Sequence, residues 1–564
     1  MSTGTVGASF LGEAFASPVE AARDFFRWIK VPEEQSEVWR DYRKVWAAAA
    51  FLRALPLANP PKGTVLIAAV DSPFYEIKLM SMLAVALRLA GWRPVVLTNS
   101  PKSRWPRRYF RAFGVTDFVY WDQLALAPAE MAACDRTAGE LLAQPLTFAA
   151  AKMWTCEDCW IGPQILSAVS RGALQGAPDV TDPAVVSQIR DRLPDTLRRI
   201  RFARQVLDAV RPEMMLIIEA NYAKYAPITD LAVHRGVNVI QITQPNRDDA
   251  LVVRRLTRAT RREHPSSLAR ENFLRLRQEP WTEREERELG EIFAGRYGGR
   301  WFLQARNQVG AEALSREQVF QRFQLDPAKK TAVVFSHVLW DANLFYGEDL
   351  FADYGDWFVQ TVRAACQNPR LNWLIKMHPA NAWKRARMGT TTELSEVALI
   401  RQHIGTVPPH VRLLYPDEKV STRSLFDMAD YGVTVRGTVS VELPCFGVPT
   451  LTAGTGRCHG MGFTVDSNSV EEYLGRLARL EDLERITPEQ TQWAKRHAHT
   501  VFCRRPWFMK SFRAEFQPAS VRRHMIEHNL HLSATSLAEL EQTGDLAKFA
   551  EWAAANANVD YFDH

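Results

Sequence analysis

The sequence has few features of an exported or membrane-spanning protein. Its seven cysteines are an odd number spread over 564 residues, which favours reduced thiols over a disulfide framework. The first thirty residues lack the basic start and apolar run of a secretory signal. The most apolar stretch, residues 79–91, contains Arg88 and is shorter than the roughly 20 apolar residues that a bilayer-spanning helix needs. We therefore expect a cytoplasmic location, with attachment to the inner face of the membrane as one alternative.

An excess of one charge is also absent. The chain has 70 Lys and Arg against 64 Asp and Glu, a net charge of +6, which is too small for its length to predict a nucleic-acid partner. A single Cys-x-x-Cys pair, Cys156 and Cys159, has no second pair and no histidine at ligand spacing, which favours ordinary thiols over structural zinc. Short repeats and low-complexity tracts are also missing, which disfavours solenoids and propellers.

What the sequence does contain is typical of a large soluble α/β protein. Hydrophobic residues make up 46% and charged residues 24%, which excludes a disordered, collagenous or coiled-coil chain. Continuous apolar strands alternate with helices in two regions, as in parallel sheets that are covered on both faces. The expected fold is two doubly wound Rossmann-like domains facing a cleft, with added helices. In the first of these domains, residues 64–250, the expected strands are 64–70, 94–98, 214–218 and 237–241.

The second domain is expected at residues 330–484, with strands at 331–335, 372–377, 411–414, 431–435 and 449–451. Residues 1–63 are expected to form a helical extension and residues 485–564 a helical tail with a basic and aromatic patch at 504–510. Residues 251–329 contain no expected strand and start with five closely spaced arginines, so they are interpreted as a solvated helical connector. Docking of this segment to an anionic acceptor or a membrane surface is the alternative. The arginines are Arg254, Arg255, Arg258, Arg261 and Arg262.

Candidate functional residues follow the strands of the second domain, at the edge where open parallel sheets bind ligands. His337 and Asp341 follow the strand 331–335, and Lys376 and His378 end the strand 372–377. In the first domain, Glu219 follows the strand 214–218 and is a candidate acid or base, with a helix N-terminal charge as the equal alternative.

Two glycine-containing turns complete the predicted site. The run 434–442 is a strand that enters a glycine and then small hydroxyl residues, a turn suited to a phosphate, and it supplies Arg436, Gly437, Thr438, Ser440 and Glu442. The run 453–462 holds four glycines in ten residues, including Gly454 and Gly456, which favours close approach of the backbone to a ligand. Neither run matches G-x-x-x-x-G-K-[ST], and the first strand-to-helix turn lacks G-x-G-x-x-G, so a Walker-type ATPase and a classical dinucleotide enzyme are disfavoured.

Residues 330–470 resemble the bacterial capsule polysaccharide biosynthesis family, which includes Kdo transferases of GT-B fold. The resemblance rests on residues 338–347 (VLWDANLFYG), 373–379 (WLIKMHP), 436–442 (RGTVSVE) and 462–464 (GFT). It implies that Lys376, His378, Ser440 and Glu442 contact a nucleotide-sugar donor, and that Asp341 lies near the anomeric carbon. The glutamine that usually precedes the family's Asp motif is Ser336 or His337 here.

The predicted function is therefore metal-independent glycosyl transfer from a nucleotide-activated sugar, CMP-Kdo-like for example, in capsule or other surface polysaccharide assembly. No Asp-x-Asp follows a strand, so helix N-termini and basic side chains would stabilise the leaving phosphate. The expected partners are the donor and a glycan or glycolipid acceptor, with no cofactor. A nucleotide-sugar epimerase and a non-catalytic polysaccharide-assembly protein are the alternatives.

Overall fold

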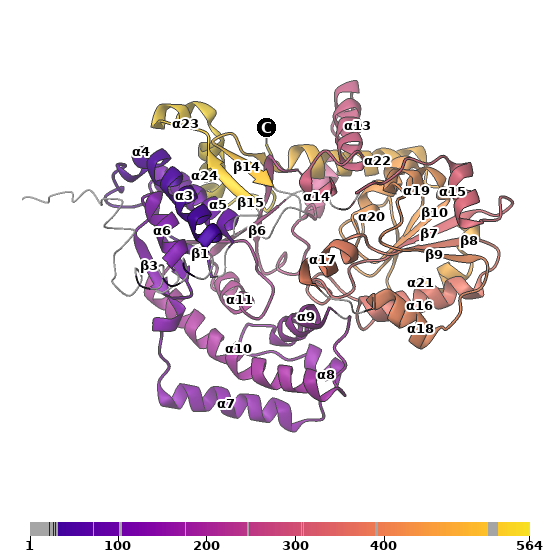
Figure 1. The fold of residues 1–564 in the computed structure, drawn as a ribbon, viewed down its shortest axis with the longest axis horizontal. Helices are drawn as coiled ribbons and strands as arrows, with labels where there is room; N and C mark the ends of the chain where they lie inside the picture. Colours follow the sequence, from indigo (N-terminus) through magenta and orange to yellow (C-terminus); the bar gives the residue numbers. More distant parts are fainter. Residues whose placement is uncertain are drawn as a thin grey trace, which may run out of the picture.

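A computed structural model describes residues 32–563 apart from 71–72, 101–103, 175, 245–246, 306, 308, 390–392 and 517–527, together with residues 22, 26 and 29. Most of the predicted N-terminal extension, residues 1–31, lies outside the described residues. The extension's described part is helical, with α3 and α4 preceding the first strand. The two predicted α/β regions are both present, and they lie at opposite ends of the molecule (Figure 1).

The first sheet has seven strands in the order β13-β6-β5-β4-β1-β2-β3. Strands β1 to β5 are parallel, whereas β6 is antiparallel to β5 and β13 is antiparallel to β6. The central order 3-2-1-4-5 is the doubly wound arrangement, whose chain reverses direction between β1 and β4. The strands are β1 (Thr64–Ala68), β2 (Arg93–Thr98), β3 (Asp117–Tyr120), β4 (Met214–Ile217), β5 (Asn238–Thr243), β6 (Ala250–Leu256) and β13 (Pro506–Phe508).

Helices cover both faces of this sheet because successive strand side chains point to opposite sides. Val65 and Ile67 pack into one core with α3, α5, α6 and α24, whereas Leu66 and Ala68 pack into another with α7 to α11. The bounds are α3 (Pro32–Ala48), α4 (Ala50–Arg53), α5 (Phe74–Leu89), α6 (Arg104–Ala112), η1 (Trp121–Gln123), α7 (Pro128–Ala143), α8 (Phe148–Lys152), α9 (Ile161–Ala173), α10 (Pro183–Val210) and α11 (Ala226–His234).

The second sheet has six strands, all parallel, in the order β12-β11-β10-β7-β8-β9. This is again the doubly wound order, with its reversal between β7 and β10. Val334 packs on the face covered by α16, α18 and α21, and Val333 packs on the face covered by α15 and α19. The strands are β7 (Thr331–Phe335), β8 (Asn372–Lys376), β9 (Val411–Leu414), β10 (Tyr431–Thr434), β11 (Thr450–Ala453) and β12 (Val465–Ser467).

The expectation that strands are absent from residues 251–300 is wrong. Strand β6 occupies 250–256 and is buried along its whole length in the first sheet. Arg254 and Arg255 are therefore core residues: Arg254 pairs with Glu263 and Asp560, and Arg255 donates to the carbonyls of Trp552 and Ala553. Because both guanidinium groups are enclosed by the protein, this pair cannot serve as an anionic docking surface.

The predicted helical tail also contains strands. Strand β13 completes the edge of the first sheet, and the hairpin of β14 (Phe512–Phe516) and β15 (His528–Leu532) follows it. In the predicted basic patch, Arg505 and Trp507 are buried, so only part of that patch faces solvent. The C-terminal segment lies against the N-terminal helices, as the yellow and indigo ribbons in Figure 1 show.

Further helices connect the sheets and complete the second one. Among the helices of the described ranges, none combines the length and apolar character needed to cross a membrane. Their bounds are α12 (Arg270–Leu276), α13 (Glu283–Tyr297), α14 (Phe302–Ala305), α15 (Arg316–Phe323), α16 (Tyr354–Gln367), α17 (Ala380–Met388), α18 (Ser395–His403), α19 (Thr422–Met428), α20 (Val439–Glu442), η2 (Leu443–Phe446), α21 (Val470–Ala478), η3 (Leu480–Asp482), α22 (Pro488–His499), η4 (Thr500–Arg504), α23 (Leu537–Thr543) and α24 (Asp545–Ala555).

Candidate functional site

A cavity of about 340 Å³ opens at the carboxyl edge of the second sheet. It lies where β7, β8 and β10 end, and the neighbours β7 and β10 form the point at which the strand order reverses. Loops diverge at such a point and leave a crevice for a ligand. Six residues predicted from the sequence line this cavity, namely His337, Lys376, His378, Gly437, Thr438 and Glu442.

Lys376 carries an ammonium group that has no acidic partner in the cavity. Its side chain is 8% exposed, and no carboxylate among the described residues lies within ion-pair distance of its Nζ. Burial lowers the pKa of Lys376 from 10.5 to about 8. An enclosed cation without a counter-ion attracts an anion, so Lys376 is poised to bind a negatively charged ligand group.

Arg457 is a second cation in the same cavity, and the sequence prediction missed it. Its Nε donates to the Arg436 carbonyl at 3.2 Å, and its Nη2 lies 3.0 Å from His264 Nε2. Within the described ranges no carboxylate pairs with Arg457. The only available signal was its place as the single arginine of the glycine-rich run after β11, and the sequence does not show that this loop turns toward β10.

The two cavity histidines are neutral and present opposite tautomers. Burial lowers the pKa of His337 to about 4 and holds the pKa of His378 well below its usual value. His378 Nδ1 accepts the Ala380 N–H at 3.1 Å, so the ring proton sits on Nε2. His337 Nδ1 lies 3.3 Å from the Val338 carbonyl, which can only accept, so its proton sits on Nδ1. His378 thus retains an Nε2–H donor, and His337 retains an Nε2 acceptor.

Glu442 lines the cavity, but part of its carboxylate is already engaged. Arg296 Nη2 lies 2.7 Å from Glu442 Oε1, and the Tyr297 hydroxyl donates to the same oxygen at 3.1 Å. Both partners come from the end of α13, and Arg296 and Glu442 are almost fully buried. The pair therefore anchors α13 beside the cavity, and hydrogen bonding of Glu442 to a sugar hydroxyl stays a prediction.

Ser440 and Arg436 are turned away from the cavity. Ser440 Oγ donates to the Gly437 carbonyl at 2.8 Å within its own turn. Arg436 is 2% exposed, and its guanidinium donates to the Thr455 carbonyl, the Glu348 carbonyl and Asp349. Because these donors are satisfied by the protein, Arg436 braces the loops behind the cavity. The expected contact of either residue with a donor has no counterpart in this arrangement.

The glycine-rich run after β11 packs against protein. Gly454 has φ +77°, and a Cβ there would lie 2.4 Å from the Glu348 carbonyl oxygen. Gly347 faces the same contact from the other loop, with a Cβ position 2.2 Å from Thr455 Oγ1. A Cβ on Gly456 would meet only ordinary contacts. Close packing of two loops therefore accounts for Gly454, and neither Gly454 nor Gly456 lines the cavity.

Asp341 lies at the contact between the two domains. Its Oδ1 accepts the Tyr222 hydroxyl at 2.9 Å, and its Oδ2 lies 2.7 Å from Lys384 Nζ. Burial alone would raise the pKa of Asp341, but the Lys384 ammonium and then Arg171 outweigh it, so the pKa lies below its usual value. Asp341 is consequently a carboxylate at neutral pH.

Glu219 faces Asp341 across the same contact, and its environment acts in the opposite direction. Burial raises the pKa of Glu219, with the Asp341 charge adding to the effect, although the Asn221 N–H and Arg171 partly oppose it. Two carboxyl groups whose pKa values are driven apart are the usual arrangement of an acid and a base. The predicted candidates Glu219 and Asp341 thus meet, one from the end of β4 and one from the loop after β7.

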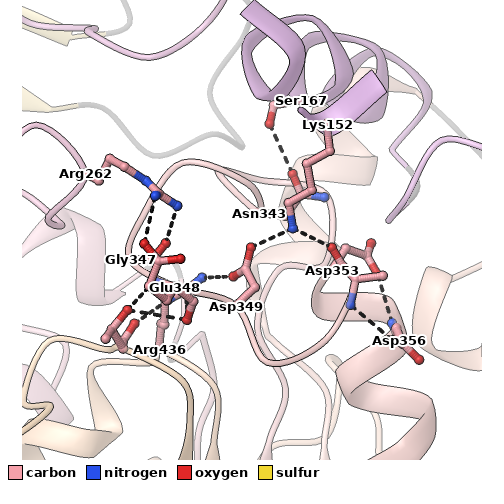
Figure 2. A network of polar contacts seen from close by, with 12 residues as sticks. Lys152, Ser167, Arg262, Asn343, Gly347, Glu348, Asp349, Asp353, Asp356 and Arg436 are labelled. Atoms are coloured by element: carbon pink, nitrogen blue, oxygen red, sulfur yellow. Dashed lines mark hydrogen bonds and ion pairs between the residues drawn. The ribbon is translucent and has the colours of Figure 1, made fainter. Parts of the chain in front are cut away.

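The loop after β7 holds the domains together through a network of ion pairs (Figure 2). Asp349 bridges the domains, because its Oδ2 lies 2.9 Å from Lys152 of α8 and its Oδ1 lies 2.5 Å from Arg436. Leu344 of this loop packs into a core of the first domain. The loop therefore couples the cavity side of the second sheet to the first domain.

Replacing Asp349 by Asn should destabilise the protein. Lys152 and Arg436 would lose their shared carboxylate while staying largely buried, and breaking a buried pair costs about 3 kcal/mol. Urea denaturation followed by tryptophan fluorescence measures the change. Glu348→Gln is the matched control: its side chain is 75% exposed and pairs with Arg262, so a loss of about 0.5 kcal/mol at most is expected. Equal losses in the two variants would contradict the bridging role.

A larger cavity, about 740 Å³, lies between α13 and α22. Its charged lining is mostly paired within the protein: Glu279 with Arg504, Glu288 with Arg284, and His499 with Glu288. Because it lies away from the strand ends and its charges are satisfied, it is a weaker ligand site than the strand-end cavity. Among the described side chains, no group of three His, Cys, Asp or Glu could hold a metal ion.

Comparison with known proteins returned solved structures only. No protein-family model matches the chain, and no curated protein matches it. A KpsC β-Kdo 2,4 transferase of Thermosulfurimonas dismutans is 12% identical with a TM-score of 0.28, over 50% of this chain and 78% of that one. The UDP-GlcNAc 2-epimerase of Neisseria meningitidis is 11% identical with a TM-score of 0.29, over 78% and 97%. The spinosyn rhamnosyltransferase SpnG is 12% identical with a TM-score of 0.25, over 78% and 95%.

These likenesses are distant and carry no argument about activity. The α/β fold with two Rossmann-like sheets follows from the strand orders given above. The resemblance of the motifs to the capsule polysaccharide family remains a prediction.

Proposed function

We propose that this protein is a glycosyltransferase that uses a nucleotide-activated sugar. The observation that carries the proposal is the pair of cations without carboxylate partners, Lys376 and Arg457, in a cavity at the strand ends of a doubly wound sheet. A diphosphate or monophosphate ester supplies the negative charge that this pair lacks. The neutral His378, with its Nε2–H, adds a hydrogen-bond donor to the same anion.

The chemistry of the proposed reaction divides between the cavity and the domain contact. When the bond between sugar and phosphate breaks, negative charge grows on the leaving phosphate, and the Lys376 and Arg457 cations stabilise it. At the domain contact, Asp341 is ionised and Glu219 holds its proton more tightly. One of these two carboxyl groups removes the proton from the acceptor hydroxyl or acts as the nucleophile. This scheme assigns leaving-group stabilisation to side chains and needs no metal ion.

The donor and acceptor classes come from the motif resemblance. It favours a CMP-Kdo-like or related donor, and a glycan or glycolipid acceptor in capsule or other surface polysaccharide assembly. The cations of the cavity bind phosphate and do not select the base or the sugar. We place the acceptor beside Glu219 on the first domain.

A nucleotide-sugar epimerase on the same scaffold is the second candidate, since the same cavity and carboxyl pair would serve it. The two activities differ in whether product forms without an acceptor. Incubation with UDP-sugars alone, followed by product analysis, separates them. A non-catalytic assembly protein would neither turn over nor hydrolyse any donor.

The direct test is ligand binding followed by turnover. Thermal-shift screening against CMP-, UDP-, GDP- and dTDP-sugars should identify the donor, because a ligand at 100 times its Kd stabilises the folded state by about 2.7 kcal/mol. Assays in the presence of EDTA also test the predicted independence of metal ions. A protein that no nucleotide sugar stabilises or reacts with would contradict the proposal.

Replacing His378 by Ala is expected to lower donor turnover by about 10²-fold or more, because the Nε2–H donor to the phosphate is lost. Turnover and melting temperature are measured together, so that a folding defect is recognised. His410→Ala is the control: His410 also follows a loop of the second sheet, but it contacts the Ala365 carbonyl outside the cavity. Full activity in His378→Ala would remove this histidine from the site.

A further inference from the structure

A buried glutamate lies behind the two cavity histidines and is used by none of the chemistry above. Glu396, in the first turn of α18, is 1% exposed. Its neighbours in the described chain are neutral donors, and no cation lies within ion-pair distance of its carboxylate. A buried carboxylate without a cation is costly, and burial raises the pKa of Glu396 from 4.5 to about 7.

The donors around Glu396 come from the ends of two strands. Asn381 Nδ2 donates to Glu396 Oε1 at 2.7 Å, and Ser336 Oγ donates to the same oxygen at 3.3 Å. The backbone N–H of His378 also donates to the carboxylate. Ser336 directly precedes His337 after β7, whereas His378 and Asn381 follow β8. One carboxylate thus ties together the two loops that carry the cavity histidines.

The rest of this contact fixes the histidine rings. His378 Nδ1 accepts the Ala380 N–H, and the Asn381 N–H donates to the His378 carbonyl at 3.0 Å. The turn 378–381 is therefore held from both sides, by its own backbone and by Glu396. The rings of His337 and His378 lie 6.5 Å apart, centre to centre, on the cavity side of this tie.

We propose that Glu396 is a positioning residue for the nucleotide site: its carboxylate cross-links the β7 and β8 loops and sets the placement of His337 and His378. This inference rests on the proposed function for its consequence in ligand binding, but the placement of the rings can be tested without a ligand. Retention of a costly buried charge fits such a role, because a site can keep a destabilising group that its geometry needs.

The test compares Glu396→Gln with Glu393→Gln, an exposed glutamate just before the same helix that pairs with Arg401 at 2.9 Å. Histidine ring signals are recorded in ¹⁵N-histidine-labelled protein and assigned with His337→Asn and His378→Asn. Glu396→Gln should move the signals of His378 and His337, while Glu393→Gln should leave them in place. Because glutamine is uncharged, the melting temperature of Glu396→Gln at pH 8 should not fall.

Binding is measured on the same proteins with CMP and UDP by calorimetry. We expect the affinity of Glu396→Gln to fall about 10-fold and that of Glu393→Gln to stay unchanged. Unmoved histidine signals, or unchanged affinity in a protein that binds nucleotide, would overturn the positioning role. If the wild type binds neither nucleotide, the proposed function fails, and the histidine signals alone decide the role of Glu396. Asn381→Ser, which keeps the carboxylate and removes its shortest hydrogen bond, gives the same comparison if Glu396→Gln does not fold.

Discussion

Replacing Lys376 by Met should weaken nucleotide binding by about 100-fold, or about 2.7 kcal/mol. Lys376 is enclosed and faces no carboxylate in the described chain, so a bound phosphate would be its counter-ion. A charge-assisted hydrogen bond in such a site contributes more than an exposed one, because water does not compete for either group. Methionine fills a similar volume without the charge.

The same substitution should stabilise the unliganded protein at neutral pH. The pKa of Lys376 falls from 10.5 in the unfolded chain to about 8 in the folded one. Below pH 8 both states hold the proton, and the folded state carries the whole cost of burying it, about 3 kcal/mol. Between pH 8 and 10.5 the folded state releases this proton first, so the cost disappears as the pH rises. The stabilisation by Lys376→Met should therefore be largest below pH 8.

Calorimetry and melting curves at pH 7 and pH 9 test both effects. Wild-type affinity for the nucleotide should fall as the pH rises through 8, while Lys376→Met should lose most of this dependence. Lys329→Met is the control, since Lys329 lies on the surface of the same domain, 3.7 Å from Asp326. A variant that binds nucleotide as tightly as the wild type would show that the phosphate does not contact Lys376.

Replacing Glu219 by Gln or Asp341 by Asn should lower kcat by about 10³-fold with donor affinity nearly unchanged. The reason is their position: both lie at the domain contact, outside the lining of the cation-bearing cavity. Because the pKa of Glu219 is raised and that of Asp341 is lowered, the two substitutions should remove opposite limbs of the pH profile of kcat. Loss of Glu219 removes the group that titrates at the higher pH.

The measurement is initial rate against donor concentration over a pH series. Asp208→Asn serves as the control, because Asp208 forms an exposed ion pair with Arg235 in the first domain. If both variants keep full kcat, acid–base work must belong to other groups, and His337 with its free Nε2 acceptor is the next candidate. A loss of donor affinity at constant kcat would instead place these carboxylates on the donor.

Most strands could be predicted from the sequence because strands buried on both faces form continuous apolar runs. Strands 331–335 and 411–414 of the second sheet have the predicted bounds. The exception is instructive: β6 contains Arg254 and Arg255 and reads as a polar segment. Its arginines are tolerated in the core because Glu263, Asp560 and backbone carbonyls far along the chain satisfy them. No local pattern contains those partners.

The candidate site divides in the same way. His337, Lys376 and His378 could be placed beside one another because they end neighbouring parallel strands, whose carboxyl ends share one edge. Arg436 and Gly454 were also expected at the ligand, but they hold two loops together. Their residue types suit both roles, and only the folded position separates them.

The sequence by itself determined the two α/β regions, the edge of the second sheet at which ligand groups gather, and most residue types found there. Periodicity and strand ends are local properties of the chain, and they survive without knowledge of its partners. The tertiary structure alone decided which charges are paired. It shows that Arg436 and Glu442 have protein partners, that Lys376 and Arg457 have no carboxylate partner in the described chain, and that Glu219 and Asp341 meet. Pairing depends on distances between segments hundreds of residues apart, and folding sets those distances.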